Sequence, residues 1–204
     1  MKKTLYIISM FCLLLIGNSC IVDSEVSFLT EAEELGFTGT RDDIEEFLST
    51  EVLSVMTTLG LDINTGSEPV DVTGIFVASP YCRAAATDPN VELSCGFRDF
   101  VITFSNQNDE NQTISYQSAQ FDENGVQTFS ENGNGFISGD SSGNFTIIVR
   151  AVSGDGGENA TAFSGRMTAE GIVSYQDIFV PNITSGEALE GALFIDEDGT
   201  ASRQ

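Results

Sequence analysis

Apolar residues recur with two different periods along this chain, and the period changes near residue 70. Between residues 40 and 60 they recur at steps typical of one helix face. Thr40, followed three residues later by Asp43, is typical of a helix N-cap, and Gly60 is typical of a helix end. We therefore predict a helix over 40–60 packed on the domain, with binding of a partner as the alternative. The predicted apolar stripe consists of Ile44, Phe47, Leu48, Val52, Val55, Met56 and Leu59.

From residue 70 onward the apolar period is two, and glycine-rich turns separate the alternating segments, as in antiparallel β structure. Turns such as Asn132-Gly133 supply residues that accept a positive φ. A meander of this length must hide its edges, so we predict a mainly β domain that closes as an up-and-down barrel or folds as a β-sandwich. One or two short helices precede it, lying across an open end or against an outer wall. The expected strands are 72–78, 97–105, 113–121, 125–130, 135–138, 144–152, 161–168, 171–180 and 192–195.

The N-terminus has the pattern of a secretory signal peptide over residues 1–19. Lys2 and Lys3 precede an apolar run over residues 5–16. A helix of that length rises only ~18 Å, too short for a hydrocarbon core of ~30 Å. The sequence Gly17-Asn18-Ser19-Cys20 resembles the lipobox of bacterial lipoproteins. This resemblance implies acylation of Cys20; the alternative is ordinary cleavage after Ser19.

The cysteines provide one further expectation. Cys12 leaves with the signal peptide, and acylation of Cys20 would leave Cys82 and Cys95 as the remaining pair. An exported location favours a disulfide between them. Chain-entropy arithmetic gives such a short loop about 3 kcal/mol of stabilisation. A catalytic cysteine is the rival interpretation, and the absence of histidine argues against it.

The charge balance excludes several classes of function. The formal net charge is −23, and all 31 acidic residues follow Cys20, where the only cations are six arginines. A polyanion such as nucleic acid would be repelled, and anionic lipid surfaces are disfavoured. No histidine is present and no lysine follows Lys3, which removes imidazole catalysis and Schiff-base chemistry.

Two acidic segments are candidate metal sites. Asp196-Glu197-Asp198-Gly199 resembles part of a calcium loop but lacks a closing bidentate acid. Asp155, Glu158 and Asn159 form a second acidic loop with less support. We expect solvated acidic loops and no bound metal or cofactor.

Arginines in the predicted strands offer a different hypothesis. Arg98, Arg150 and Arg166 would each place a charge on a strand, where it must face water or a carboxylate. We expect all three to point outward and to pair with neighbours such as Asp99. An inward arginine that holds an anionic ligand is the alternative.

Several short motifs between Ile63 and Pro181 resemble those of uncharacterised Bacteroidetes-type lipoproteins with a lipocalin-like (calycin-like) β domain. The resemblance implies a lipid-anchored protein of the outer membrane or cell surface, whose barrel holds a ligand. Fold analogy alone identifies no ligand site. The motifs are Ile63-Asn-Thr-Gly66 with Pro69, Val72-Thr-Gly74-Ile-Phe76, Phe104-Ser-Asn-Gln-Asn108, Gly135-Phe-Ile-Ser-Gly139 with Gly143-Asn-Phe-Thr-Ile147, and Phe163-Ser-Gly165 with Gly171-Ile172.

These observations predict a non-enzymatic binding or interaction module, anchored to the membrane through Cys20, with a small apolar ligand or a protein as its partner. The alternative is a structural envelope lipoprotein whose barrel is filled and binds nothing. A hydrolase that uses only carboxylates is a third interpretation. The expected organisation is a signal peptide over 1–19, a tether over 20–29, a helical segment over 30–62, a β domain over 63–184 and an acidic appendage over 185–204.

The lipid anchor is testable by metabolic labelling. We expect labelled palmitate to appear on the protein and to be lost in Cys20→Ala, because the acylated thiol is removed. Incorporation that persists in Cys20→Ala would contradict the anchor.

Overall fold

The computed structural model describes residues 34–97, 99–121, 126–152 and 157–204, together with positions 28, 32 and 124. The signal peptide, Cys20, Arg98 and Asp155 lie outside the described residues. Residues 36–204 form one compact unit. No helix in the described part of the chain is long and apolar enough to cross a membrane.

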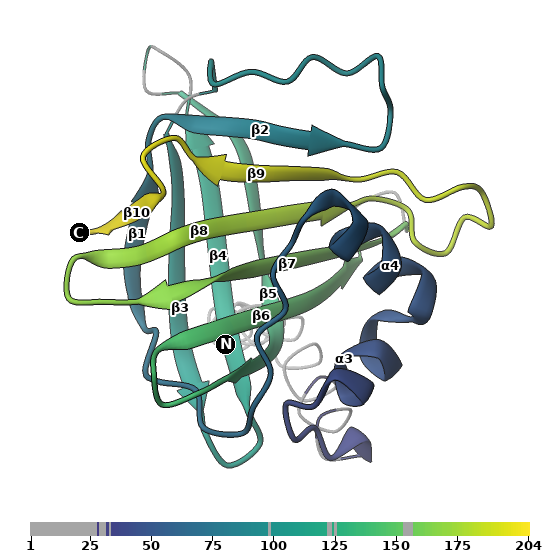
Figure 1. Cartoon of the computed structure of the whole chain (residues 1–204), viewed down its shortest axis with the longest axis vertical. Coiled ribbons are helices and arrows are strands. Elements are labelled where there is room, and N and C mark those ends of the chain that lie inside the picture. Colours follow the sequence, from purple (N-terminus) through teal and green to yellow (C-terminus); the bar gives the residue numbers. More distant parts are fainter. Residues whose placement is uncertain are drawn as a thin grey trace, which may run out of the picture. The chain divides into compact units, whose positions relative to one another are not determined.

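From residue 36 onward, two helices precede a set of antiparallel strands (Figure 1). The helices are α3 (Arg41–Leu48) and α4 (Thr50–Leu59). The strands are β1 (Gly74–Ala78), β2 (Tyr81–Ala86), β3 (Phe100–Asn108), β4 (Thr113–Phe121), β5 (Gln127–Gly139), β6 (Asn144–Val152), β7 (Glu158–Met167), β8 (Gly171–Val180), β9 (Ala192–Asp196) and β10 (Thr200–Arg203).

The last strand closes the sheet into a barrel. On one side β10 pairs with β1, with Phe76 opposite Arg203, and on the other it pairs with β8, with Ala201 opposite Ile172. Strands β1, β3, β4, β5, β6, β7, β8 and β10 thus form a closed antiparallel ring. The predicted mainly β fold is confirmed as a barrel, consistent with a lipocalin-like barrel. Strands β9 and β2 extend the wall beyond β8.

The strands differ from the expected ones in three places. Asn132-Gly133 is not a turn, because β5 runs unbroken through it and Gly133 lies opposite Tyr116 of β4. A Cβ on Gly133 would lie 3.0 Å from the Tyr116 ring, so the glycine makes room for an aromatic side chain. The short strand β2 was not predicted. The acidic appendage expected over 185–204 supplies β9, where a strand was expected over 192–195, and also the closing strand β10, which was not predicted.

The predicted helix over 40–60 is interrupted at Ser49. Its ends are as expected: Thr40 and Asp43 form a capping box, and Gly60 ends α4 in the left-handed conformation. Ser49 has φ 81° and ψ 154°, which no helix residue adopts, and its hydroxyl accepts from the amide of Val52 to cap α4. The prediction of one continuous helix is therefore wrong.

The helices pack against the outer wall of the barrel around β6, β8 and β9 (Figure 1). The Phe47 ring meets the outward-facing Phe136 of β5 edge-on, with ring centroids 5.0 Å apart. Arg150 of β6 donates to the Phe47 carbonyl and forms an ion pair with Glu158. Arg150 thus points outward as predicted, although its partner is Glu158 and not Asp99. Arg166 is exposed.

The segment that links α4 to β1 is fixed to the barrel by small polar residues on the outer face. The Asn64 side chain donates to the Phe145 carbonyl and the Ser164 hydroxyl, each at 3.0 Å. The Ser138 hydroxyl donates to the Asn64 carbonyl at 2.6 Å. Ser138 and Ser164 are buried and Asn64 is half-buried, and all three are paired, so the outer wall tolerates them.

Inside the barrel, one end is filled by apolar side chains. They are fully buried and come mainly from alternate positions of the ring strands, as the period of two requires. The largest are Phe76, Phe104, Ile114, Tyr116, Ile137, Phe145, Ile147, Phe163 and Tyr175.

Candidate functional site

A disulfide joins Cys82 of β2 to Cys95, which confirms the predicted pairing. It holds the segment that follows β2 against the strand, where Arg83 N–H also donates to the Ser94 carbonyl at 2.9 Å. Tyr81 then forms a bridge with Phe97. The disulfide therefore helps to hold Phe97 beside Tyr81.

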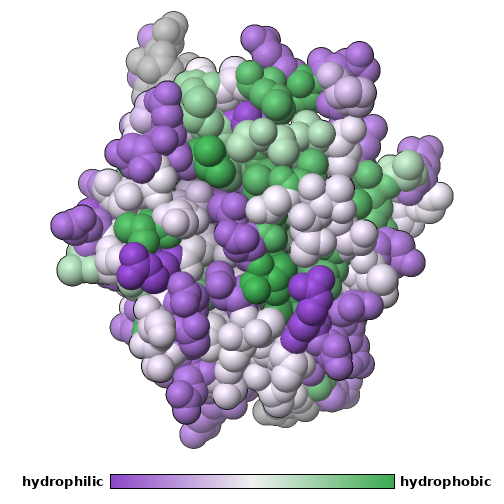
Figure 2. All heavy atoms as spheres, viewed as in Figure 1, coloured by the Kyte–Doolittle hydropathy of each residue, from purple (hydrophilic) through white to green (hydrophobic). Residues whose placement is uncertain are grey.

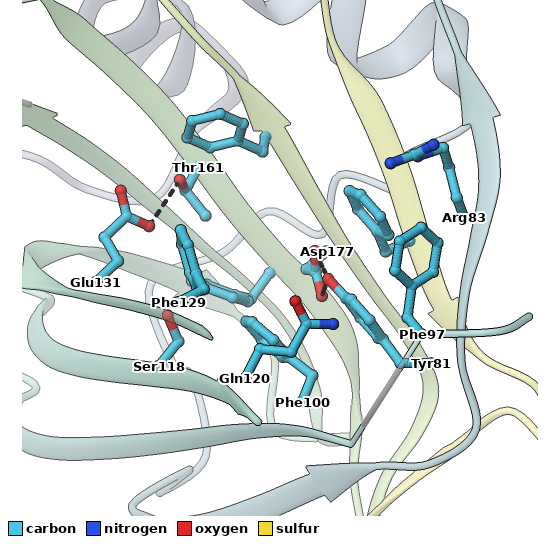
Figure 3. Close-up of a pocket in the computed structure, with 13 residues that line it drawn as sticks. Tyr81, Arg83, Phe97, Phe100, Ser118, Gln120, Phe129, Glu131, Thr161 and Asp177 are labelled. Atoms are coloured by element: carbon cyan, nitrogen blue, oxygen red, sulfur yellow. Dashed lines mark hydrogen bonds between the residues drawn. The ribbon is translucent and has the colours of Figure 1, made fainter. Parts of the chain in front are cut away.

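A cavity of about 200 Å³ lies in the barrel (Figure 3) and borders the filled core at Phe163. An apolar cavity of ~150 Å³ is large enough to bind benzene, so this volume suits a small ligand. Phe129, which is 41% exposed, lies where the cavity meets solvent. The aromatic lining residues are Tyr81, Phe97, Phe100, Phe129, Phe163, Phe179 and Phe194, and the others are Arg83, Ser118, Gln120, Glu131, Thr161 and Asp177.

Strand register places the polar groups inside. On β4 and β5, Ser118 lies directly opposite Glu131. On β7, β8 and β9, Asp177 lies between Phe163 and Phe194. Side chains directly opposite each other on one face of a sheet are neighbours, so each polar group is set beside a fixed partner.

Asp177 is the deepest ionisable group of the cavity and is only 4% exposed. Tyr81 donates its hydroxyl to the carboxylate, with 2.8 Å to either oxygen, and Tyr175 donates to Oδ2 at 2.8 Å. Burial raises the pKa of Asp177 to about 7, against the opposing effect of the two tyrosine hydroxyls; the charge of Glu131 adds to the rise. Burial and the Asp177 charge raise the pKa values of both tyrosines.

Glu131 and Ser118 form the less satisfied side of the cavity. Burial raises the pKa of Glu131, and the hydroxyls of Tyr116 and Thr161 oppose this rise. Thr161 donates to Oε2 at 3.5 Å, which is a long hydrogen bond. The Ser118 hydroxyl is buried and has no hydrogen-bond partner among the described residues. Figure 3 shows Ser118, Glu131 and Thr161 on one side of the cavity, away from Arg83.

Arg83 is the cation of the lining. Its guanidinium lies 4.9 Å from the Phe97 ring centroid and 5.5 Å from that of Phe194. Nη1 donates to the Glu92 carbonyl at 3.2 Å, while Nε is buried without a partner among the described residues. The inward arginine thus comes from the unpredicted strand β2 and not from Arg150 or Arg166.

A second hollow of about 240 Å³ adjoins the first and shares Arg83, Phe179 and Phe194 with it. Figure 2 shows apolar side chains gathered on this face over the β2 and β9 region, with hydrophilic side chains around them. The three shared residues therefore form a wall between two apolar recesses.

The suspected calcium loop is a tight turn between β9 and β10. Asp196 accepts from the amides of Ser79 and Asp198, and Asp198 accepts from the amide of Thr200. These carboxylates therefore accept hydrogen bonds from backbone amides in and beside the turn. Within the described residues, no group of three or more His, Cys, Asp or Glu side chains is placed to hold a metal ion.

No family model, curated protein or solved structure matches the chain. The resemblance to Bacteroidetes-type lipoproteins therefore stays a prediction. Sequence reasoning missed Ser118, Glu131 and Asp177 because it identified no inward polar positions. A signal was present at Asp177, an acid flanked at alternate positions by Tyr175 and Phe179 of a predicted strand.

The raised pKa of Asp177 generates a prediction about stability. The unfolded chain ionises this group near pH 4 and the folded chain near pH 7, so stability falls as pH rises through that window. At ~1.4 kcal/mol per pKa unit, the loss is about 4 kcal/mol. We expect Asp177→Asn to remove this loss in denaturant unfolding measured from pH 4 to 8.

The matched control is Asp42→Asn, which changes an exposed carboxylate on α3 and should retain the wild-type dependence on pH. An Asp177→Asn variant with the same pH dependence as the wild type would show that Asp177 does not titrate in this window.

Proposed function

We propose that the protein is an exported, lipid-anchored binding protein that holds a small, mainly apolar ligand at one end of its barrel. The cavity of about 200 Å³ carries this proposal. Seven of its thirteen lining residues are aromatic, and a few polar groups converge among them. This combination of an apolar lining and a few fixed polar groups is typical of ligand sites.

The lipid anchor is the second part of the proposal. It rests on the signal-like N-terminus and on Cys20, which follows Gly17-Asn18-Ser19. The barrel would then be presented at the outer membrane or cell surface. The absence of histidine, and of lysine beyond Lys3, supports a non-enzymatic role.

A structural lipoprotein with a filled barrel is the other candidate, and the apolar core favours it at one end. Phe76, Phe104 and Phe145 fill that part of the interior. The buried Ser118 hydroxyl argues for the binding function at the other end. An unpaired polar group is costly in a core that only fills space.

Toluene binding to the full chain tests the cavity. We expect toluene to bind the wild type and to bind at least ~tenfold more weakly to Ser118→Phe, because the new ring occupies the recess. Ligand-observed NMR with a toluene titration measures the affinity, and circular dichroism verifies the fold.

The matched control is Gln117→Phe, the same substitution at the next position of β4, where the side chain is exposed. It should bind toluene like the wild type. Equal toluene binding by Ser118→Phe, or no binding by the wild type, would contradict the proposed site.

A further inference from the structure

We propose that the barrel cavity selects ligands that carry a protonated amine on an aromatic or apolar body, with the amine held between Glu131 and Ser118. This inference rests on the proposed binding function and names its ligand class.

The first argument is the balance of charge inside the cavity. Glu131 and Asp177 contribute two carboxylates, and Arg83 contributes one guanidinium. Among the described residues, neither carboxylate forms an ion pair with an arginine. The ion pair found in this part of the chain joins Arg150 to Glu158. Asp177 is buried and Glu131 is half-buried, and a carboxylate withdrawn from water without a countercharge is unfavourable. A cationic ligand would supply that charge.

The second argument is hydrogen bonding. Asp177 is already served by two tyrosine hydroxyls at 2.8 Å, whereas Thr161 donates to Glu131 only at 3.5 Å. The Tyr116 hydroxyl, which lowers the pKa of Glu131, makes no hydrogen bond of ordinary length among the described residues. The Ser118 hydroxyl lies opposite Glu131 in the strand register and has no partner among the described residues. An ammonium carries three donors and no acceptor. It matches a carboxylate beside a serine oxygen better than a hydroxyl with one donor does.

The third argument is the aromatic lining. Phe129 and Phe163 lie in the same cavity as Glu131. Aromatic rings bury the apolar body of a ligand and also attract a nearby cation through their negative faces. The same walls therefore suit both parts of an aromatic amine.

An anionic ligand is the opposite hypothesis, and Arg83 is the residue that would favour it. Its Nε is unpartnered among the described residues, but Phe97 and Phe194 lie against its guanidinium and Nη1 already donates to the Glu92 carbonyl. An anion would also share the cavity with two carboxylates. The geometry therefore favours the amine.

Three ligands of similar shape test the inference by calorimetry on the full chain at pH 8: phenethylamine, 2-phenylethanol and 3-phenylpropionate. We expect phenethylamine to bind about tenfold or more tightly than 2-phenylethanol, the order of a charge-assisted hydrogen bond. The 3-phenylpropionate should bind most weakly. At an ionic strength of ~0.15 M, negative charges of the protein that lie more than ~8 Å from the ligand are largely screened.

Glu131→Gln should reduce the ratio of phenethylamine to 2-phenylethanol affinities at least fivefold. Its matched control, Glu110→Gln, removes an exposed carboxylate between β3 and β4 and should keep the ratio. If Glu131→Gln does not fold, Ser118→Ala serves instead and should lower the same ratio.

Equal affinities for amine and alcohol, or tightest binding of 3-phenylpropionate, would overturn the amine inference while toluene binding still supported the cavity. An equal reduction of the ratio in Glu110→Gln would also overturn it, because the preference would then come from the overall charge. Failure of all three ligands and of toluene would instead reject the proposed function itself.

Discussion

Closure of the sheet by β10 is the constraint on which the rest of the structure depends. This strand of four residues pairs with β1 on one side and with β8 on the other. Without it, two strands would present unpaired edges, which native proteins avoid. A closed ring also fixes which alternate side chains face inward. The filled core, the cavity and the polar groups beside it all follow from that register.

The interior of the barrel combines an apolar core with a cavity in which Arg83 is the cation beside two carboxylates. At one end apolar side chains such as Phe104 and Phe145 fill the space. At the other, Asp177 is stabilised by tyrosine hydroxyls in place of an arginine. This arrangement keeps a carboxylate in the barrel without an internal ion pair, and it leaves Glu131 and Ser118 with unused hydrogen-bonding capacity.

Much of the fold could be predicted from local patterns. The limits of the strands over 113–121, 144–152 and 171–180, and the caps at Thr40 and Gly60, agree with the structure because alternation and capping are local properties. The unbroken strand β5, the closing strand β10 and the break at Ser49 depend on distant partners. The same holds for the site, since the pairing of Ser118 with Glu131 exists only once β4 and β5 are in register.

The central claim is that the barrel cavity holds a small molecule. The most direct measurement is native mass spectrometry of the full chain purified from its own cells. We predict a discrete small-molecule adduct that denaturation removes, that Gln117→Phe retains and that Ser118→Phe loses. A clean unliganded mass, or an adduct equally present in Ser118→Phe, would contradict the claim.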